Sequence, residues 1–360
     1  MSRIFNNILV TGGAGFIGSN FIRYIFKQKE FTGRVVNLDK LTYAGFAGSL
    51  DDVVSSVPDG RYVLEVGDIG DSETVSRVLK TYDIDCIVHF AAESHVDRSI
   101  EGPSVFIQTN ILGTFTLLEE SRRYWGDRED VLFHHVSTDE VYGSLEDEGY
   151  FKESTPYDPR SPYSASKASS DHLVRSYHHT YGMPYTLSNC SNNYGPYQFP
   201  EKLIPLMIEN MLEGKALPVY GDGKNIRDWL YVEDHNSALW SIITRGRIGE
   251  SYNIGGENEW ENIHLVKELC RIMAKLTEKD EEDYLNLISM VQDRPGHDRR
   301  YAIDCSLIKS ELGWSQSLDF EEGLAKTVKW YLDERAWVDK IKSGEYRNWI
   351  ETNYMQRDEK

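Results

Sequence analysis

A glycine-rich segment near the N-terminus constrains the fold of this chain more than any other feature of its sequence. Residues 11–18 are Thr-Gly-Gly-Ala-Gly-Phe-Ile-Gly. They follow the β-branched run 7–10 and precede apolar residues at helical spacing, from Phe21 to Phe26. Glycines let the backbone turn tightly and approach a pyrophosphate, whose charge is stabilised at the helix N-terminus. Strand, glycine-rich turn and helix in this order predict a dinucleotide-binding unit.

Short apolar runs alternate with helix-length segments through the first half of the chain. The runs cover residues 7–10, 34–38, 62–66, 86–90 and 131–136. Such alternation predicts an α/β fold, a Rossmann-like doubly wound parallel sheet. From about Asn192 the pattern loosens, and prolines separate shorter elements. These prolines are Pro196, Pro200, Pro205 and Pro218.

The chain of 360 residues is long enough for two domains. We expect a dinucleotide-binding domain over residues 1–195 and a smaller C-terminal α/β substrate-binding domain over residues 196–360. The strand-like run 251–254 indicates that residues 225–255 return to the first domain. The boundary between the domains is therefore expected to be interleaved.

The charge balance limits the partners of the chain. With 39 basic and 58 acidic residues the net charge is −19, which would repel nucleic acid and an anionic membrane surface. A phosphate-bearing substrate must then be met by a local group of cations. The four cysteines have no metal-ligand spacing, so we expect no metal and a reducing compartment. Since no apolar run approaches 18 residues, we expect a soluble cytoplasmic protein.

An acidic residue ends the second apolar run. Asp39 lies 21 positions beyond Gly18, where a carboxylate can accept hydrogen bonds from ribose hydroxyls and would repel a 2′-phosphate. This favours NAD over NADP, although the neighbouring Lys40 could accommodate a phosphate. Asp68 and Ile69 follow the third run and are predicted at the adenine side. Residues 90–94 follow the fourth run and are predicted near the pyrophosphate and ribose.

A polar segment and a Tyr/Lys pair predict the chemistry. Thr138, Asp139 and Glu140 stand at the end of the fifth run, and Tyr163 precedes Lys167 by four residues at the start of a helix. Positions i and i+4 share a helix face, so both side chains can approach one point. A nearby ammonium favours the phenolate, which predicts a lowered Tyr163 pKa and a base for an alcohol proton.

These motifs together resemble the extended short-chain dehydrogenases and, within them, the dTDP-glucose 4,6-dehydratases. The resemblance extends over nearly the whole chain, and its most discriminating part is Thr138-Asp139-Glu140. The other matching segments are residues 11–18, 91–97, 163–167, 192–196 and 294–301.

The resemblance implies a reaction in which the oxidant is regenerated. Tyr163 would deprotonate the sugar 4-hydroxyl while NAD takes the C4 hydride. Glu140 would remove the C5 proton, Asp139 would protonate the departing 6-hydroxyl, and the hydride would return to C6. Thr138 would hydrogen-bond the sugar near C4, and the product would be a 4-keto-6-deoxy sugar nucleotide.

The residues and the resemblance together predict two sets of binding residues. The cofactor set is Gly12, Gly15, Phe16, Ile17, Gly18, Asp39, Lys40, Leu41, Thr42, Asp68, Ile69, Phe90, Ala91, Ala92, Ser94, Thr109, Tyr163, Lys167 and Asn193. The substrate set is Ser94, His95, Thr138, Asn192, Glu201, Lys202, Leu203, Pro218, Tyr220, Arg227, Asn262, Arg294, His297 and Tyr301. Arg227, Arg294 and also Arg300 are candidates for the diphosphate, because guanidinium groups grip phosphate oxygens bidentately.

The substrate expected from the resemblance is dTDP-glucose or a close nucleotide sugar, and thymine and uracil remain alternatives. The family is usually dimeric, so a homodimer through helices near residues 103–125 and 164–181 is expected. Another nucleotide-sugar dehydratase or a 4-epimerase on the same fold is the nearest alternative. Asp139 and Glu140 argue against the epimerase, which needs neither a C5 base nor a C6 acid. A non-catalytic NAD-sensing scaffold is the alternative from another class.

Overall fold

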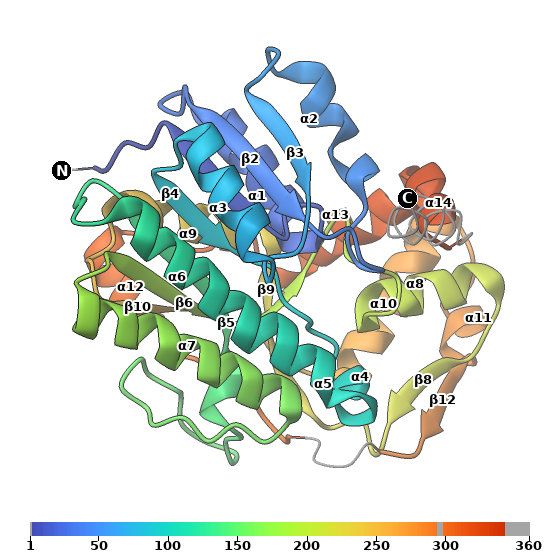
Figure 1. Cartoon of the computed structure of the whole chain (residues 1–360). Helices are drawn as coiled ribbons and strands as arrows, with labels where there is room; N and C mark the ends of the chain where they lie inside the picture. The colour runs from blue at the N-terminus through green and yellow to red at the C-terminus, as the bar shows by residue number, and fades with distance from the viewer. Residues whose placement is uncertain (1, 294–297, 343–360) are drawn as a thin grey trace.

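The computed structural model describes residues 2–293 and 298–342. Within them, seven parallel strands form the main sheet (Figure 1). Their order across the sheet is β10 (Ser251–Ile254), β6 (Tyr185–Cys190), β5 (Leu132–Thr138), β4 (Cys86–His89), β1 (Asn7–Thr11), β2 (Arg34–Asp39) and β3 (Tyr62–Val66). The chain winds outward from β1 in both directions, which confirms the predicted doubly wound fold.

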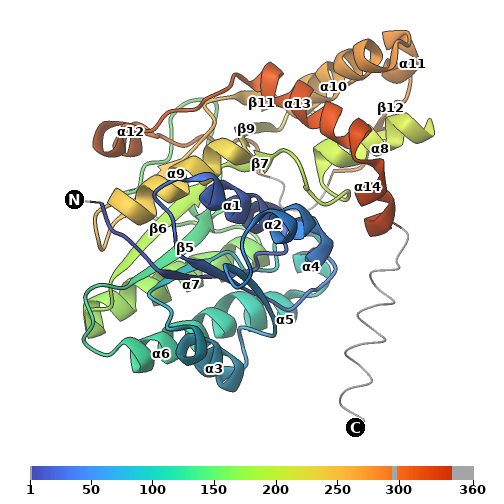
Figure 2. The same cartoon turned by 90° about the horizontal axis from the view of Figure 1, so that it is seen from above.

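Helices cover both faces of the main sheet, as Figure 2 shows from above. One face carries α3 (Ser72–Tyr82), α6 (Thr114–Trp125) and α7 (Pro162–Tyr181). The opposite face carries α1 (Phe16–Lys27), α9 (Val232–Arg245) and α12 (Ser306–Leu312). Successive strand residues point to opposite faces, so Leu9 packs in the cluster with Leu117 while Ile8 and Val10 pack with Phe21. Burial on both faces explains why β1 and β4 are rich in β-branched apolar residues.

Short elements gather where the strands of the main sheet end. They are η1 (Ala47–Leu50), α2 (Asp51–Ser56), α4 (Val96–Glu101), α5 (Pro103–Phe106), the π-helix η2 (Ile107–Gly113) and the 3₁₀-helix η3 (Asp139–Tyr142). Parallel strands deliver their carboxyl ends to one edge of the sheet, so loops from several strands meet there.

The C-terminal half adds two small sheets with their own core. One contains β11 (Glu259–Glu261), β9 (Ile226–Tyr231) and β7 (Asn192–Tyr194), and the other pairs β12 (Ile288–Val291) with β8 (Leu217–Tyr220). The helices of this half are α8 (Leu203–Glu213), α10 (Asn262–Thr277), α11 (Glu281–Leu285), α13 (Phe320–Asp333) and α14 (Arg335–Lys342). Trp337 on α14 donates from Nε1 to Ser49 Oγ (3.0 Å), which ties this half to the segment after β2.

The segment expected to return to the first domain does so in part. β10 pairs with β6, and α9 packs against α1. β9 instead pairs with β7 and β11 in the smaller sheet. The domain limits at residues 195 and 196 stay a prediction. In the described ranges, no helix is long and apolar enough to cross a membrane.

Candidate active site

A cavity of about 400 Å³ lies along the carboxyl ends of the parallel strands. Its floor is the glycine-rich turn between β1 and α1, where Gly12 has a φ of +71° and a Cβ would lie 2.8 Å from the Ala91 backbone. A Cβ on Gly18 would lie 2.5 Å from the Gly12 carbonyl oxygen. The N-terminus of α1, capped by Gly15, has no side-chain cap, which leaves its amides to face an anion. The turn therefore fits a pyrophosphate.

Asp39 lies at the end of β2 and borders this cavity. Its carboxylate accepts hydrogen bonds from the backbone N–H of Ala14 (2.9 Å) and of Leu41 (2.8 Å). Burial raises the pKa of this carboxyl, and the two hydrogen bonds oppose the rise. Lys40 Nζ pairs with Asp68 Oδ2 at 2.6 Å. Carboxylates at positions 39 and 68 would repel the 2′-phosphate of NADP and can accept hydrogen bonds from ribose hydroxyls, in keeping with NAD.

Nearly every predicted cofactor residue lines the cavity. The predicted cofactor residues that line it are Gly12, Gly15, Phe16, Ile17, Gly18, Asp39, Lys40, Thr42, Asp68, Ile69, Phe90, Ala91, Ala92, Ser94, Thr109, Tyr163, Lys167 and Asn193. The exception is Leu41, whose side chain is fully buried in a small cluster with Ala14. Leu41 has a φ of +53°. Its predicted cofactor contact stays a prediction.

Aromatic and charged side chains that the sequence did not single out close one end of the cavity. Tyr43 meets Phe199 edge to face with ring centres 5.8 Å apart, and the Arg98 guanidinium lies 3.9 Å from the Tyr43 ring centre. Arg98 on α4 also pairs with Glu201 at 2.8 Å. Tyr43 and Phe199 stand in loops without a periodic pattern, so only their proximity to Thr42 and Glu201 in the sequence could have indicated them.

The Thr138–Asp139–Glu140 segment leaves the end of β5 and turns into η3. The Thr138 side chain caps this turn by accepting from the Glu140 N–H (3.3 Å), and it donates to Asp139 Oδ1 (3.3 Å). All three residues line the cavity. Asp139 is 2% exposed, and its Oδ2 has no hydrogen-bond partner among the described residues.

The charge environment of Asp139 favours its neutral form. Burial raises the pKa of its carboxyl well above the usual value, and the charges of Glu140 and Asp228 raise it further. Arg227 opposes these effects. A carboxyl that keeps its proton near neutral pH can act as an acid.

Tyr163 and Lys167 occupy the first turns of α7, which begins with a capping box between Ser161 and Ser164. Thr138 lies close enough to Tyr163 to lower the pKa of its phenol, and Lys167 Nζ donates to the Val136 carbonyl (2.9 Å). Both side chains line the cavity.

The pKa of Tyr163 is raised in this arrangement, where the sequence predicted a lowered one. Burial raises the pKa of the phenol well above its usual value, and the carboxylates of Glu140 and Asp139 add to the rise. Burial also lowers the pKa of Lys167, because it disfavours the charged ammonium form of the side chain. A further positive charge in the cavity is needed to reach a phenolate.

The predicted substrate residues fall into two groups. Ser94, Thr138, Asn192, Glu201 and Lys202 line the cavity. His95, Leu203, Pro218, Tyr220, Arg227, Asn262 and Tyr301 lie outside its lining, on α4, α8, β8, β9, α10 and the segment after residue 298. Arg294 and His297 lie outside the described residues.

The second group adjoins the catalytic carboxylates. Arg227 lies over the Tyr301 ring, 4.4 Å from its centre, and its charge lowers the pKa of Asp139. The charge of Glu140 in turn helps to raise the pKa of Tyr301. Among the described residues, Asn192 Oδ1 and Asn262 Oδ1 are buried without a hydrogen-bond partner. These orphaned amide oxygens fit a ligand that donates hydrogen bonds.

Arg300 is engaged in contacts within the chain. Its guanidinium is buried and forms a bidentate ion pair with Glu259, at 2.6 and 3.0 Å. It also donates to the Gly149 carbonyl (3.0 Å). The Arg227 guanidinium is also engaged, since it donates to the Ile226 (2.7 Å) and Asp298 (3.0 Å) carbonyls. The diphosphate role of Arg227, Arg294 and Arg300 stays a prediction.

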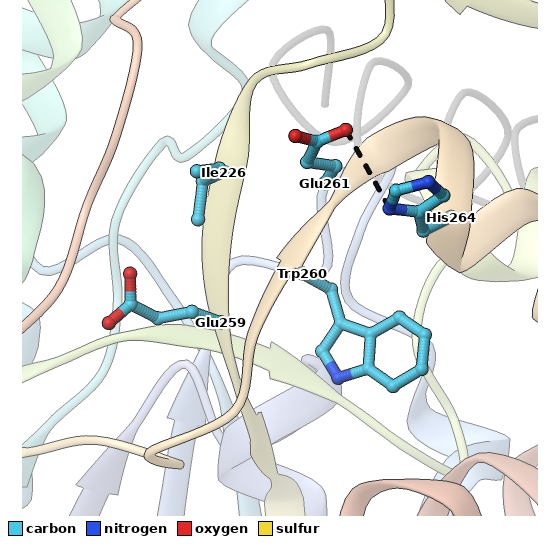
Figure 3. A pocket seen from close by; sticks show the side chains of 5 residues that line it. All are labelled: Ile226, Glu259, Trp260, Glu261 and His264. Atoms are coloured by element: carbon cyan, nitrogen blue, oxygen red, sulfur yellow. Dashed lines mark ion pairs between the residues drawn. The ribbon is translucent and has the colours of Figure 1, made fainter. Parts of the chain in front are cut away.

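A second hollow of about 290 Å³ lies beside β9, β11 and the start of α10 (Figure 3). Its lining residues are Ile226, Glu259, Trp260, Glu261 and His264. His264 Nδ1 lies 3.6 Å from Glu261 Oε2. Two carboxylates make this hollow unfavourable for a diphosphate. Neither here nor elsewhere in the described chain could a group of three or more His, Cys, Asp or Glu residues hold a metal ion.

Known proteins resemble this chain over most of its length. A family model described as GDP-mannose 4,6 dehydratase matches residues 9–327. The dTDP-glucose 4,6-dehydratase 1 of Escherichia coli (strain K12) is 55% identical over 364 residues, covering 97% of this chain and 99% of that protein. The dTDP-glucose 4,6-dehydratase DesIV of Streptomyces venezuelae, solved with NAD bound, is 44% identical with a TM-score of 0.84, covering 93% and 99% of the two chains. The UDP-glucose 4-epimerase of Thermotoga maritima is 29% identical with a TM-score of 0.79, covering 91% and 99%.

Proposed function

The chain belongs to the GDP-mannose 4,6 dehydratase family, and from this premise we propose that it is an NAD-dependent hydro-lyase acting on dTDP-glucose. It converts this substrate to dTDP-4-keto-6-deoxyglucose and water. The observation that carries the proposal is the meeting of Asp139 and Glu140 with Tyr163 and Lys167 in one cavity. A Tyr/Lys pair alone serves oxidation at C4. The two extra carboxylates supply the base and the acid that loss of water across C5 and C6 requires.

When bound, NAD supplies a hydride acceptor for C4, a hydride donor for C6 and, in its oxidised form, a positive ring charge. The glycine turn and the open N-terminus of α1 would hold its pyrophosphate, and Asp39 its ribose. Tyr163 takes the proton of the 4-hydroxyl, to which Thr138 donates or accepts a hydrogen bond. Lys167 supports the phenolate form of Tyr163.

The new ketone at C4 acidifies the proton on C5, and Glu140 removes it. Asp139 protonates the 6-hydroxyl so that it leaves as water. The raised pKa of Asp139 supports this assignment, because an acid must hold its proton at the working pH. A 4-epimerase needs neither step and is disfavoured for that reason.

The nucleotide part of the substrate is assigned to the second group of residues. Arg227, together with Arg294, would face the diphosphate with planar cations, which matters in a chain of net charge −19. Asn192 and Asn262, whose buried amide oxygens lack partners among the described residues, would accept hydrogen bonds from the ligand.

We also propose a cytoplasmic homodimer. Five large apolar side chains on α4, α5, η2 and α6 are each between 42% and 53% exposed. They are Ile100, Val105, Ile107, Leu112 and Phe115. Exposed apolar side chains along neighbouring helices favour pairing with a second copy. The four cysteines are free and buried, in keeping with a reducing compartment.

Product analysis tests the proposed function. The purified protein is incubated with dTDP-glucose or UDP-glucose without added NAD, and the products are identified by mass and NMR. The expected product has lost one water, carries a ketone at C4 and a methyl group at C6, and forms faster from dTDP-glucose. Recovery of the 4-epimer, or no conversion of either sugar nucleotide, would contradict the proposal.

A further inference from the structure

Asp171 lies directly behind the Tyr/Lys pair on the same helix. Tyr163, Lys167 and Asp171 are spaced by four residues along α7, so they share one face. Asp171 is 0% exposed and does not line the cavity. The steps assigned to the active-site residues do not use it. A fully buried carboxylate requires partners, and their identity indicates its role.

The partners of Asp171 come from three segments, which are β5, β6 and the stretch before α7. Its Oδ2 accepts hydrogen bonds from Ser137 Oγ (2.8 Å) and Tyr157 OH (2.9 Å), and Asn189 Nδ2 lies at 3.5 Å. Its Oδ1 lies 3.2 Å from His135 Nε2. Ser137 immediately precedes Thr138 in β5. The carboxylate therefore anchors the end of the strand from which the catalytic segment departs.

The charge of Asp171 is matched by a buried cation. Burial alone would raise the pKa of Asp171, but the nearby His135, the charge of Lys167 and the hydrogen bond from Ser137 outweigh it, so its pKa is lowered. Burial lowers the pKa of Lys167, and Asp171 is the first of the groups that oppose this effect. The hydrogen bond from Lys167 to Val136 O goes to a neutral carbonyl, which supplies no counter-charge.

Other titratable groups face the pair from every neighbouring element. Those facing Asp171 are His135 on β5, Tyr142 on η3, Tyr157 before α7, Tyr185 on β6, and Lys167 and Arg175 on α7. Two further groups, His89 on β4 and Cys190 on β6, face Lys167. His135 is buried with a pKa lowered to about 4, so it is neutral. Arg175 is only partly buried and donates to Tyr157 OH (2.9 Å) and Ser251 Oγ (3.2 Å).

We propose that Asp171 is a positioning residue of the redox step: its buried carboxylate is the counter-charge that keeps Lys167 an ammonium, and it anchors Ser137 beneath Thr138. This role rests on the proposed function. Asp171 acts through Lys167 and never touches the substrate. An ammonium at position 167 favours the Tyr163 phenolate, so the loss of Asp171 weakens the base for the 4-hydroxyl.

The sign of the pH effect follows from which form of Lys167 is active. The ammonium is present below the pKa of Lys167 and is lost as pH rises through it. Asp171→Asn keeps the shape of the side chain and removes the charge, so the pKa of Lys167 falls further. The alkaline limit of C4 oxidation should move to lower pH by the same amount.

The experiment measures C4 oxidation alone across the neutral and alkaline range. The holoenzyme is mixed with dTDP-glucose in a single turnover, and the absorbance of the reduced nicotinamide is followed. Reduced nicotinamide forms before water is lost, so its absorbance reports C4 oxidation alone. Asp171→Asn should move the alkaline limb of the pH–rate profile to lower pH, and Asp171→Glu should restore its position. Tyr157→Phe is the matched control, because it removes one hydrogen bond from Asp171 and keeps the charge. Its alkaline limb should match that of the wild type.

Each outcome is decisive. An unshifted alkaline limb in Asp171→Asn, or an equal shift in Tyr157→Phe, would overturn the counter-charge role. If Asp171→Asn does not fold, Asp171→Ser offers a smaller neutral residue with room for a water, and the same shift is required of it. If the wild type makes no dehydrated product, the proposed function fails. If the wild type turns over and the limb stays in place, only the role of Asp171 fails.

Discussion

At the scale of single residues, position 139 shows how burial turns an ordinary carboxyl into an acid. Asp139 follows a strand whose residues are all buried, and its Oδ2 lacks a partner among the described residues. Glu140 is the next residue, and its charge adds to the rise of the Asp139 pKa. Two adjacent carboxylates whose environments differ can divide the acid and base roles between them.

Asp139→Asn tests the acid role. Asn can hydrogen-bond the 6-hydroxyl but cannot supply a proton, so loss of water should slow by about 10²–10⁴-fold while C4 oxidation persists. A substrate with fluorine in place of the 6-hydroxyl depends much less on protonation and should restore most of the rate. Glu140→Gln is the matched control, and fluorine should not rescue it. Equal impairment of Asp139→Asn on both substrates would remove Asp139 from the acid role.

Tyr163→Phe tests the base at C4. The ring of Tyr163 lies edge to face with Phe106, 6.4 Å between centres, and Phe keeps this contact. Loss of the phenol should slow C4 oxidation by roughly 10²-fold or more, with little change in substrate affinity. Stopped-flow absorbance and equilibrium binding separate the two effects. Near-normal oxidation in this variant would mean that the proton leaves by another route.

At the scale of elements, the sequence predicted the strands β1 to β5 of the main sheet. It missed β6, whose buried side chains include several polar ones. The runs at β1 to β5 are within two residues of the observed strands. β6 was not predicted, although every residue in it is buried. Its Ser188 lies 3.3 Å from His134, and its Asn189 donates to the Thr138 carbonyl (3.0 Å). Such partners come from β5 and cannot be inferred from local periodicity.

The candidate site divides in the same way. Glycines and strand-end residues follow a local pattern, so the residues predicted for the cofactor lie together along the cavity. Tyr43, Phe199 and Asp171 depend on contacts between distant segments. The Tyr163 pKa was predicted with the wrong sign, because helical spacing shows that Lys167 is near but does not show how deeply both groups are buried.

Arg98 tests the contact between α4 and the segment before α8. Arg98→Ala removes the stacking on Tyr43 and the pair with Glu201. Each exposed contact of this kind contributes about 0.5–1 kcal/mol, so the loss of both should make NAD dissociate between about five- and thirty-fold faster. Cofactor release is measured by dilution of the holoenzyme. Arg123→Ala on α6 is the matched control and should leave the rate unchanged. Equal release from both variants would contradict a closing role for Arg98.

At the scale of the whole molecule, apolar residues remain exposed along α5, η2 and α6, on helices that cover one face of the main sheet. Leu112→Glu places a charge in this surface and should convert a dimer to a monomer. Val54→Glu on α2 is the matched control, since Val54 is 58% exposed away from these helices. Sedimentation velocity measures both. A dimer that survives Leu112→Glu, or a wild type that is monomeric, would contradict the proposed assembly.

The central claim is that the hydrogen removed from C4 is returned to C6 within one active site. The most direct measurement uses dTDP-glucose carrying deuterium at C4, incubated with the purified protein without added NAD. The expected product carries the deuterium in its C6 methyl group, and no reduced nicotinamide accumulates. Deuterium retained at C4, lost to solvent, or recovered in free NADH in proportion to product would contradict the account.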